Sequence, residues 1–293
     1  MVDIQAWFLL SVSVTLFWGL SGVLAKYSTG RLGVARVALL IASVEGVMYS
    51  AAFLVLREPH HITLYEGIFA SASCIVGVSG YLCYFESIME GQVAIAGTIS
   101  AAYPALTVIG AVLLLSEALG PLQAIGVAVI IVCVVAISYE PDRTAANALN
   151  RRSLLFASAA FFAWGAWSLS SKVAIEMVGP GNMFGFYVVS SLTAPVIYAW
   201  FRHVRPHKRT FASPARLIWY LGAASLALNV FGAFAYTYAL DTGMASLVVP
   251  ISSAYPIVTA LFAIAILREK LNAIQALALV GIVLGLVAIG VTV

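Results

Sequence analysis

The sequence contains very little charge. Only 9% of its 293 residues are Asp, Glu, Lys or Arg, whereas 62% are apolar. A soluble domain uses about 25% charged residues to solvate its surface. This shortage of charge excludes a soluble globular protein. Because a spanning helix needs about 20 mostly apolar residues, the composition instead predicts an all-α integral membrane protein with short loops and no separate aqueous domain.

The motifs of several enzyme classes are also missing. There is no Gly-rich phosphate loop ending in Lys-Ser or Lys-Thr, so direct nucleotide hydrolysis is not expected. All histidines fall in predicted loops, and the cysteines lie scattered in apolar stretches without metal-ligand spacing. The first apolar run follows Asp3 rather than a basic region, which argues against a cleaved signal peptide. We therefore expect no catalytic residue, no cofactor, no metal and no nucleic-acid partner.

Ten apolar runs are present, separated by turn or charge signals. The expected spans are 4–25, 34–56, 67–88, 93–115, 122–139, 154–174, 183–201, 216–239, 244–266 and 273–292. The longest breaks run from Glu140 to Arg152 and from Arg202 to Arg216, and a turn is expected at Gly30 to Gly33. The break near mid-chain is polar and predicts the seam between two halves, 1–145 and 146–293.

Basic residues are distributed unevenly over the predicted loops. With ten spans both termini lie on one side, and the loops of that side contain only two Lys or Arg residues, Arg57 and Lys172. The other thirteen lie on the opposite side. The positive-inside rule then predicts termini outside and the mid-chain seam in the cytoplasm, for a multi-pass protein of the plasma or inner membrane.

The two halves repeat one another. Trp18–Gly19 is followed eight residues later by Lys26, and Trp164–Gly165 by Lys172, 146 residues further on. At an offset of 152 the run Ser100 to Pro104 matches Ser252 to Pro256. The same offset pairs Tyr84 with Tyr236, Gly91 with Gly243, Thr107 with Thr259, Glu117 with Glu269 and Gln123 with Gln275. These ordered matches indicate a duplication.

A unit of five spans enters the membrane from the opposite side when it is repeated. Inverted repeats suit alternating access, because the two halves can exchange conformations. The duplication therefore predicts a secondary transporter with two inverted five-helix repeats. A membrane scaffold without transport activity and an embedded enzyme are the alternatives outside transport, since architecture alone does not define activity.

Helical spacing places small and polar residues along single faces of the first, fourth and ninth spans. Such stripes allow close helix packing, and they could equally line a central cavity. In the fourth and ninth spans a proline, Pro104 or Pro256, removes a backbone donor in mid-span, which predicts either a packing kink or a functional bend. The candidate cavity residues are Trp18, Tyr84, Tyr103, Trp164, Tyr236, Tyr255, Ser100 and Ser252, and the candidate hinges are Pro104 and Pro256.

Two acids depart from the repeat. Glu45 lies mid-span, where an ionised carboxylate is costly, and its repeat position is Ser191. We interpret it as a proton or cation site, with a neutral, hydrogen-bonded Glu as the alternative. Glu86 lies near the end of its span, and its repeat position is Tyr238. A coupling role at the pore mouth and simple snorkelling are both open for it.

Other charged residues have a structural interpretation. Lys26 and Lys172 end the first and sixth spans, where a cation suits the negative helix terminus. Glu117 and Glu269 precede the fifth and tenth spans, and an acid there suits the positive end of the following helix.

Four features of the sequence resemble the EamA-type proteins of the drug/metabolite transporter superfamily. They are the Trp-Gly pair at Trp18, Arg36 at the start of the second span, the Tyr-Pro pair at Tyr103 and the Glu117 turn. The resemblance covers nearly the whole chain. It implies ten helices in inverted repeats around a cavity lined by spans 1, 3, 4, 6, 8 and 9. It also implies substrates such as amino acids, other metabolites, nucleotide sugars or organic cations, often carried by proton coupling or exchange. Two features depart from it: the predicted outside termini, and Glu45.

These observations predict a monomeric or weakly dimeric carrier in the lipid bilayer. Its substrate is expected to be a small polar or amphipathic metabolite, with protons as the candidate coupling ion. The alternative within transport is an organic-cation or quaternary-ammonium carrier with an aromatic cage and Glu45 or Glu86. Import and export remain equally open.

Overall fold

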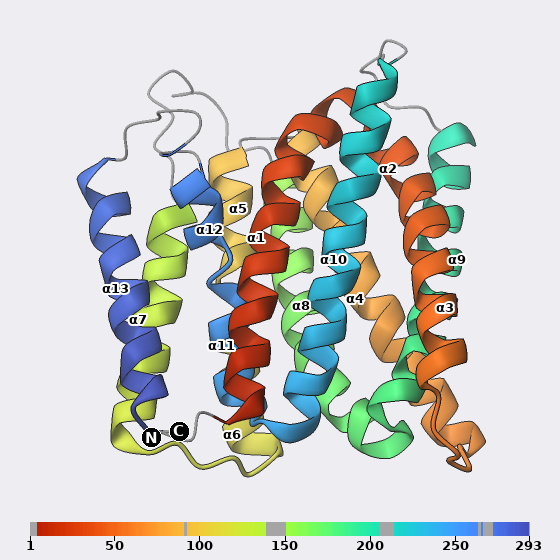
Figure 1. Ribbon diagram of the computed structural model, residues 1–293. Helices are drawn as coiled ribbons and strands as arrows, with labels where there is room; N and C mark the ends of the chain where they lie inside the picture. Colours follow the sequence, from red (N-terminus) through yellow and green to blue (C-terminus); the bar gives the residue numbers. More distant parts are fainter. Residues whose placement is uncertain are drawn as a thin grey trace.

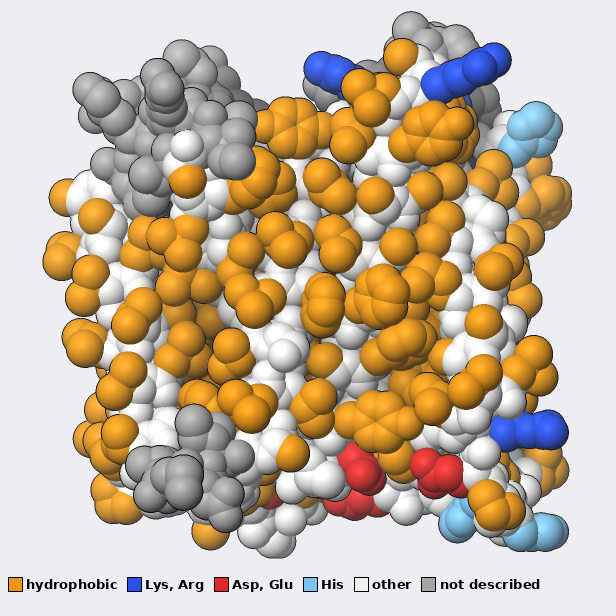
Figure 2. All heavy atoms as spheres, viewed as in Figure 1, with side chains coloured by type: hydrophobic (Ala, Val, Ile, Leu, Met, Phe, Trp, Pro, Cys, Tyr) orange, Lys and Arg blue, Asp and Glu red, His pale blue; other side chains and the backbone are white. Residues whose placement is uncertain are grey.

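We describe the protein from a computed structural model that covers residues 5–90, 93–138, 151–204, 214–262, 265 and 272–292. These residues form ten helical spans that are long and apolar enough to cross a membrane, arranged as one bundle (Figure 1). Every span was predicted from its apolar run. Side chains on the bundle surface are largely hydrophobic, as expected of surface in contact with lipid, and charged side chains gather at its upper and lower edges (Figure 2).

The first half contains five spans. The first is α1 (Ala6–Leu32), and the second is a continuous rod of α2 (Val34–Leu40), a π-helix (Ile41–Glu45) and α3 (Gly46–Leu56). The third is α4 (Leu64–Glu90), the fourth consists of α5 (Val93–Ala101) and α6 (Tyr103–Leu114), and the fifth is α7 (Pro121–Ser138).

The second half repeats this order. Its spans are α8 (Arg151–Val178), α9 (Pro180–Val204), α10 (Arg216–Thr242), the pair α11 (Ala245–Ser253) and α12 (Pro256–Phe262), and α13 (Ala273–Gly290). In Figure 1 α1 begins at the lower edge of the bundle, whereas α8 ends there, so equivalent helices run in opposite directions. The predicted fold of two inverted five-helix repeats is confirmed. The proposed seam at 145–146 lies outside the described residues.

Several predicted boundaries were wrong. The expected turn from Gly30 to Gly33 reduces to Gly33 alone, because α1 continues to Leu32. A helix satisfies its own backbone hydrogen bonds beyond the apolar core, so it continues until a residue leaves the helical region. Gly33 does so at φ 76°, and Gly179 ends α8 at φ 85°, a left-handed conformation that glycine adopts without steric cost. The two glycines are 146 residues apart, an unpredicted match between the halves.

Both Tyr-Pro spans are broken rather than merely bent. Ala102 separates α5 from α6, and Ala254 and Tyr255 separate α11 from α12. Pro104 and Pro256 stand in the first turn of the segment that follows. Proline suits this position because its missing N–H would have no intrahelical partner there. The break therefore lies at equivalent depth in the two halves.

The halves interlock through their first and third spans. Helix α1 packs along α10 of the other half, and α8 packs along α4. Helices α7 and α13 pack together, and they meet so closely that a Cβ on Gly126 would lie 2.9 Å from the carbonyl oxygen of Gly285. The interior consequently lies between elements of different halves, and any site there is shared by them.

Candidate functional site

An aromatic cluster joins the first span to the second half. The ring of Trp18 lies 5.2 Å from that of Tyr236 on α10 and 6.5 Å from that of Tyr255 at the α11–α12 break. Tyr236 is fully buried and stacks on Trp167 at 5.3 Å. Three residues predicted from sequence are thus brought together, with the tryptophan contributed by one half and both tyrosines by the other.

The repeat-related cluster has the same composition. The ring of Trp164 on α8 lies 5.6 Å from Tyr84 on α4 and 5.8 Å from Tyr103 at the start of α6. Tyr81 also meets Trp164, edge to face at 5.5 Å. We call the two clusters the Trp18 triad (Trp18, Tyr236, Tyr255) and the Trp164 triad (Trp164, Tyr84, Tyr103).

Two glycines make room for the tryptophans. A Cβ on Gly232 would lie 2.3 Å from the Trp18 ring, and a Cβ on Gly80 would lie 2.7 Å from the Trp164 ring. The two are 152 residues apart. They were not predicted as site residues, although the repeat offset that matched Tyr84 with Tyr236 also relates them.

The Trp-Gly and Tyr-Pro motifs of opposite halves pack on each other. The Thr259 hydroxyl donates to the carbonyl of Gly19 at 3.2 Å, and the Thr107 hydroxyl donates to that of Gly165 at 3.3 Å. A Cβ on Gly19 would lie 2.4 Å from the Cβ of Val258. Glycine follows the tryptophan because a neighbouring helix approaches its backbone at that position.

This contact predicts a difference between two glycines of one helix. Gly19→Ala should lower the free energy of unfolding by about 2 kcal/mol, because overpacking a tight contact costs about 1–3 kcal/mol. Gly22→Ala should be neutral or raise stability by up to about 1 kcal/mol, since its Cβ would meet only the Thr259 hydroxyl at 3.5 Å. Thermal unfolding in detergent micelles measures both variants. Equal melting temperatures would contradict the close approach at Gly19.

Buried hydroxyls beside the aromatic triads lack partners. Within the described part of the chain, the side-chain oxygens of Ser252, Ser168 and Tyr236 make no hydrogen bond. The Ser168 and Tyr236 hydroxyls are near each other, but not in hydrogen-bonding geometry. The Ser100 hydroxyl instead donates to the carbonyl of Gly97 at 3.2 Å. An unsatisfied buried hydroxyl costs about 1–3 kcal/mol, so these oxygens are candidates for contacts with a polar solute.

Glu45 lies in a hydrogen-bonded cluster next to the Trp18 triad. It is buried at the end of the π-helix, and the Asn229 side-chain amide donates to its Oε1 at 3.0 Å. The Tyr81 hydroxyl donates to Asn229 Oδ1 at 3.3 Å, and Trp18 Nε1 donates to the Asn229 carbonyl at 3.3 Å. Asn229 thereby connects the carboxyl group to the aromatic rings. Single-turn π-helices are frequently found at functional sites.

Asn229 and Tyr81 were missed in the sequence analysis. Asn229 is an amide inside an apolar span, which could have indicated a hydrogen bond between helices. At the 152-residue offset its repeat position is Gly77, and that of Tyr81 is Ala233. The polar cluster, which both halves build together, therefore has no repeat-related copy, in agreement with the expectation that Glu45 departs from the symmetry.

Glu86 has a different environment from Glu45. It is buried, and Arg202 on α9 forms an ion pair with it while donating from Nε to Oε1 at 2.8 Å. The Tyr198 hydroxyl donates to the same oxygen. Arg202 had been assigned to a loop, but α9 continues to Val204. Glu86 is thus neutralised by a neighbouring cation, whereas the hydrogen-bond partner of Glu45 is a neutral amide.

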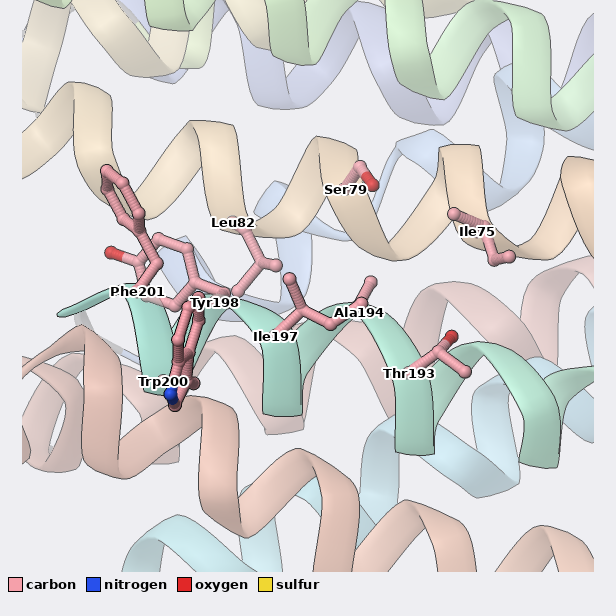
Figure 3. Close-up of a pocket in the computed structure, with 9 residues that line it drawn as sticks. All are labelled: Ile75, Ser79, Leu82, Thr193, Ala194, Ile197, Tyr198, Trp200 and Phe201. Carbon is pink, nitrogen blue, oxygen red and sulfur yellow. The ribbon is translucent and has the colours of Figure 1, made fainter. Parts of the chain in front are cut away.

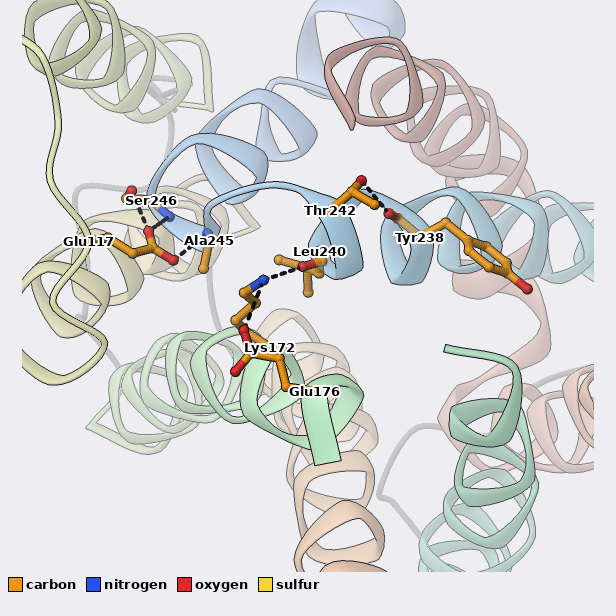
Figure 4. Close-up of polar contacts among 8 residues, drawn as sticks. All are labelled: Glu117, Lys172, Glu176, Tyr238, Leu240, Thr242, Ala245 and Ser246. Atoms are coloured by element: carbon orange, nitrogen blue, oxygen red, sulfur yellow. Dashed lines mark hydrogen bonds and ion pairs between the residues drawn. The ribbon is translucent and has the colours of Figure 1, made fainter. Parts of the chain in front are cut away.

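Glu117 caps a helix that was not the expected one. Its carboxylate accepts hydrogen bonds at 2.8 Å from the backbone N–H groups of Ala245 and Ser246 and another from the Ser246 hydroxyl, at the start of α11 (Figure 4). The prediction that it serves the following helix, α7, was wrong. The physical reason is that Met244, the N-cap of α11, provides no side-chain cap of its own, so the first N–H groups require an acceptor from elsewhere.

Lys172 contacts the end of α10, on the other side of the turn that joins α10 to α11. Its Nζ donates to the carbonyl of Leu240 at 2.8 Å, near the end of α10, and pairs with Glu176 at 3.1 Å (Figure 4). A pocket of about 300 Å³ opens between Glu117 and Lys172 beside Gly243. The repeat-related Glu269 and the Lys26 side chain lie outside the described residues.

The cap on α11 predicts a stability effect. Glu117→Ala should lower the free energy of unfolding by about 2 kcal/mol, because charge-assisted hydrogen bonds contribute about 1.5–3 kcal/mol. Glu176→Ala is the matched control. Its carboxylate is 57% exposed and pairs with Lys172, one turn away on its own helix, so the change should be within about 0.5 kcal/mol. If thermal unfolding gave the two variants the same melting temperature, the cap would not be a stabilising contact.

Both halves of the chain match a known family. Residues 5–139 and 151–291 each match the sequence pattern of the EamA-like transporter family. The chain belongs to this family. The resemblance seen in the motifs is thereby confirmed, and the protein is a multi-pass membrane transporter of the drug/metabolite type rather than a member of an enzyme family.

Comparisons beyond the family concern the fold. None of the curated proteins is detectably similar in sequence. A protein known from a crystal structure shares 19% sequence identity and superposes with a TM-score of 0.76, over 99% of this chain and 98% of that one. At this identity the likeness establishes the fold alone.

Proposed function

We propose that this EamA-family protein is a secondary active transporter that moves a small organic metabolite, amino-acid-like or another polar solute, by alternating access. The observation that carries the proposal is the pair of aromatic triads. Each joins a tryptophan of one half to two tyrosines of the other, at repeat-related positions.

The arrangement supports an exchange between two equivalent states. Each triad crosses the boundary between the halves, and we assign to one triad the contacts that separate when one side of the membrane opens. Inverted repeats allow the other triad to close in the same step. The helix breaks before Pro104 and Pro256 lie beside the triads. We assign them the role of hinges, because a broken span changes its angle without losing further hydrogen bonds.

The chemistry of the triads supports an amphipathic solute. Indole and phenol rings supply apolar faces with a polar edge. The unpartnered oxygens of Ser252 and Tyr236 supply hydrogen-bonding capacity next to them, and we assign Ser100 the equivalent place in the first half. A metabolite with a short apolar body and one or two polar groups suits this combination.

Glu45 is our candidate for the coupling residue. A carboxyl group in the membrane interior is costly when ionised, so it tends to hold a proton unless the surroundings change. Asn229 links Glu45 to Trp18. Separation of the halves at Trp18 would therefore alter the hydrogen bonding of Glu45, which couples proton binding to the position of the helices.

An organic cation is a second candidate substrate, favoured by one observation. Arg202 neutralises Glu86, whereas the described partner of the Glu45 carboxylate is the Asn229 amide. An ionised Glu45 near the indole of Trp18 would attract a cation, and aromatic faces bind quaternary ammonium groups.

Counterflow in proteoliposomes tests the proposal. Vesicles are preloaded with members of an unlabelled panel of amino acids, organic acids and quaternary amines, and uptake of the labelled compound is followed. We expect saturable exchange for one class. Trp18→Leu and Trp164→Leu should reduce it strongly, whereas Trp200→Leu should not, because Trp200 lies on the surface at 66% exposure. Absence of saturable flux for every class would favour a scaffold or an enzyme instead.

A further inference from the structure

A groove runs along the outer surface of the bundle between α4 and α9 (Figure 3). Its volume is about 460 Å³. Helix α4 contributes Ile75, Ser79 and Leu82, and α9 contributes Ala194, Ile197 and Trp200 among others. Leu82 lies seven residues beyond Ile75, which corresponds to a rise of about 10 Å along the helix axis. The groove therefore follows the direction that a lipid acyl chain takes in a bilayer.

The surface of the groove is apolar and faces outward. The Thr193 hydroxyl donates to the carbonyl of Val189 within α9, and the Tyr198 hydroxyl donates to Glu86. These two hydroxyl groups are thus already paired. Ile197 and Trp200 are 64% and 66% exposed, as expected for side chains that contact lipid.

A cation lies at the end of this groove that Tyr198 and Phe201 form. The Arg202 guanidinium lies 5.7 Å from the ring centroid of Tyr198 and 5.9 Å from that of Phe201, and both rings line the groove. The ion pair with Glu86 holds the guanidinium in place. Arginine has five N–H donors, so pairing with one carboxylate leaves capacity for a phosphate oxygen. Arg202 belongs to the edge of the bundle that is rich in basic residues, including Arg31, Arg152 and Arg216.

The fold by itself does not require this feature. The repeat positions of Tyr198 and Arg202 are Ala52 and Leu56, and that of Glu86 is Tyr238. The related face of the other half therefore lacks the charged cluster. A feature present in one repeat only points to a purpose beyond packing.

We propose that the groove binds an anionic phospholipid, with one acyl chain between α4 and α9 and the phosphate at Arg202. Two independent properties support this occupant: an apolar groove along the spanning helices α4 and α9, and guanidinium N–H groups that an ion pair holds at the end where a headgroup would lie. Basic sites between spanning helices suit anionic headgroups. The proposal is independent of the transported solute.

Native mass spectrometry of the full-length protein tests it. Protein in detergent micelles is mixed with dioleoyl phosphatidylglycerol or dioleoyl phosphatidylcholine at equal mole ratio, and the fraction that retains one lipid is measured. We expect about fivefold more retention of phosphatidylglycerol, as one basic residue near the headgroup provides. Ala194→Phe should abolish retention of both lipids by filling the groove, and Ser79→Leu is the second variant should Ala194→Phe fail to fold. Leu277→Phe, on the exposed face of α13, is the matched control and should behave like wild type.

A double substitution distinguishes the contribution of the lipid headgroup to binding from that of the acyl chain. Glu86→Gln with Arg202→Gln removes both charges together, and should reduce phosphatidylglycerol retention to the level of phosphatidylcholine. Equal retention of the two lipids by the wild type would overturn the proposal. Lipid retention at the wild-type level by folded Ala194→Phe and Ser79→Leu variants would overturn it as well. If these variants changed solute flux but not lipid retention, the groove would be a lateral route for the solute, which also contradicts the lipid site.

Discussion

Glu45→Gln should abolish proton-driven accumulation of the transported solute while leaving solute exchange in place. Glutamine has nearly the same shape and can still accept the hydrogen bond from Asn229, but it neither binds nor releases a proton. Exchange of solute for solute requires no net proton movement, whereas accumulation driven by a pH gradient does. The expected signature is therefore loss of one activity with retention of the other.

Proteoliposomes with an imposed pH gradient provide the measurement. Uptake against a solute gradient should fall to the level of empty vesicles in Glu45→Gln, and counterflow should remain close to wild type. Glu66→Gln is the matched control, since Glu66 is an exposed carboxylate at the start of α4 that accepts hydrogen bonds from Thr63. Full pH-driven accumulation by Glu45→Gln would eliminate Glu45 as the coupling residue. Loss of counterflow as well would assign Glu45 to solute binding.

Asn229→Leu extends this test. It removes both the amide donor to Glu45 and the acceptor for Tyr81, but not the backbone carbonyl that accepts from Trp18. If the amide transmits protonation to the helices, the pH profile of transport should shift although Glu45 is intact. An unchanged profile would show that Glu45 acts without Asn229.

Arg202→Leu should cause the largest loss of stability among these substitutions. It leaves Glu86 buried without its cation, and breaking one partner of a buried ion pair costs about 3–5 kcal/mol. Glu86 is only 2% exposed, and Tyr198 would remain as the donor identified at Oε1. We expect a strongly lowered melting temperature in detergent micelles, with the protein still dispersed at low temperature.

The matched variant is Glu86→Gln combined with Arg202→Leu. Removing both charges eliminates the uncompensated carboxylate, so most of the lost stability should return. Arg216→Leu, at the exposed start of α10, should have little effect and serves as the control. An Arg202→Leu variant as stable as its double mutant would mean that the ion pair does not balance a buried charge.

Features that depend on local composition were predictable. The ten spans followed from apolar runs, since a bilayer demands about 20 such residues for each crossing. The Trp18 and Trp164 motifs revealed the duplication because equivalent close contacts impose the same residues in both copies. Glu45 was recognisable because an acid in mid-span is costly wherever it points.

Features that depend on partners were not predictable in the same way. Glu117 was assigned to the helix that follows it, yet its carboxylate reaches the N-terminus of α11 in the other half. Arg202 was counted as a loop residue, yet it lies in the last turn of α9 and pairs with Glu86. A charge in the sequence indicates that some partner is needed, but not which helix end or side chain supplies it.

The sequence by itself determined that this is a duplicated membrane protein, which aromatic and proline residues recur in its halves, and where an acid interrupts the symmetry. Only the tertiary structure decided that each tryptophan meets the tyrosines of the opposite half, and that Asn229 and Tyr81 join Glu45. The physical reason is that hydrophobic length and helical period are properties of neighbouring residues, whereas these contacts form between helices far apart in the chain. Their choice depends on how the two inverted halves interlock.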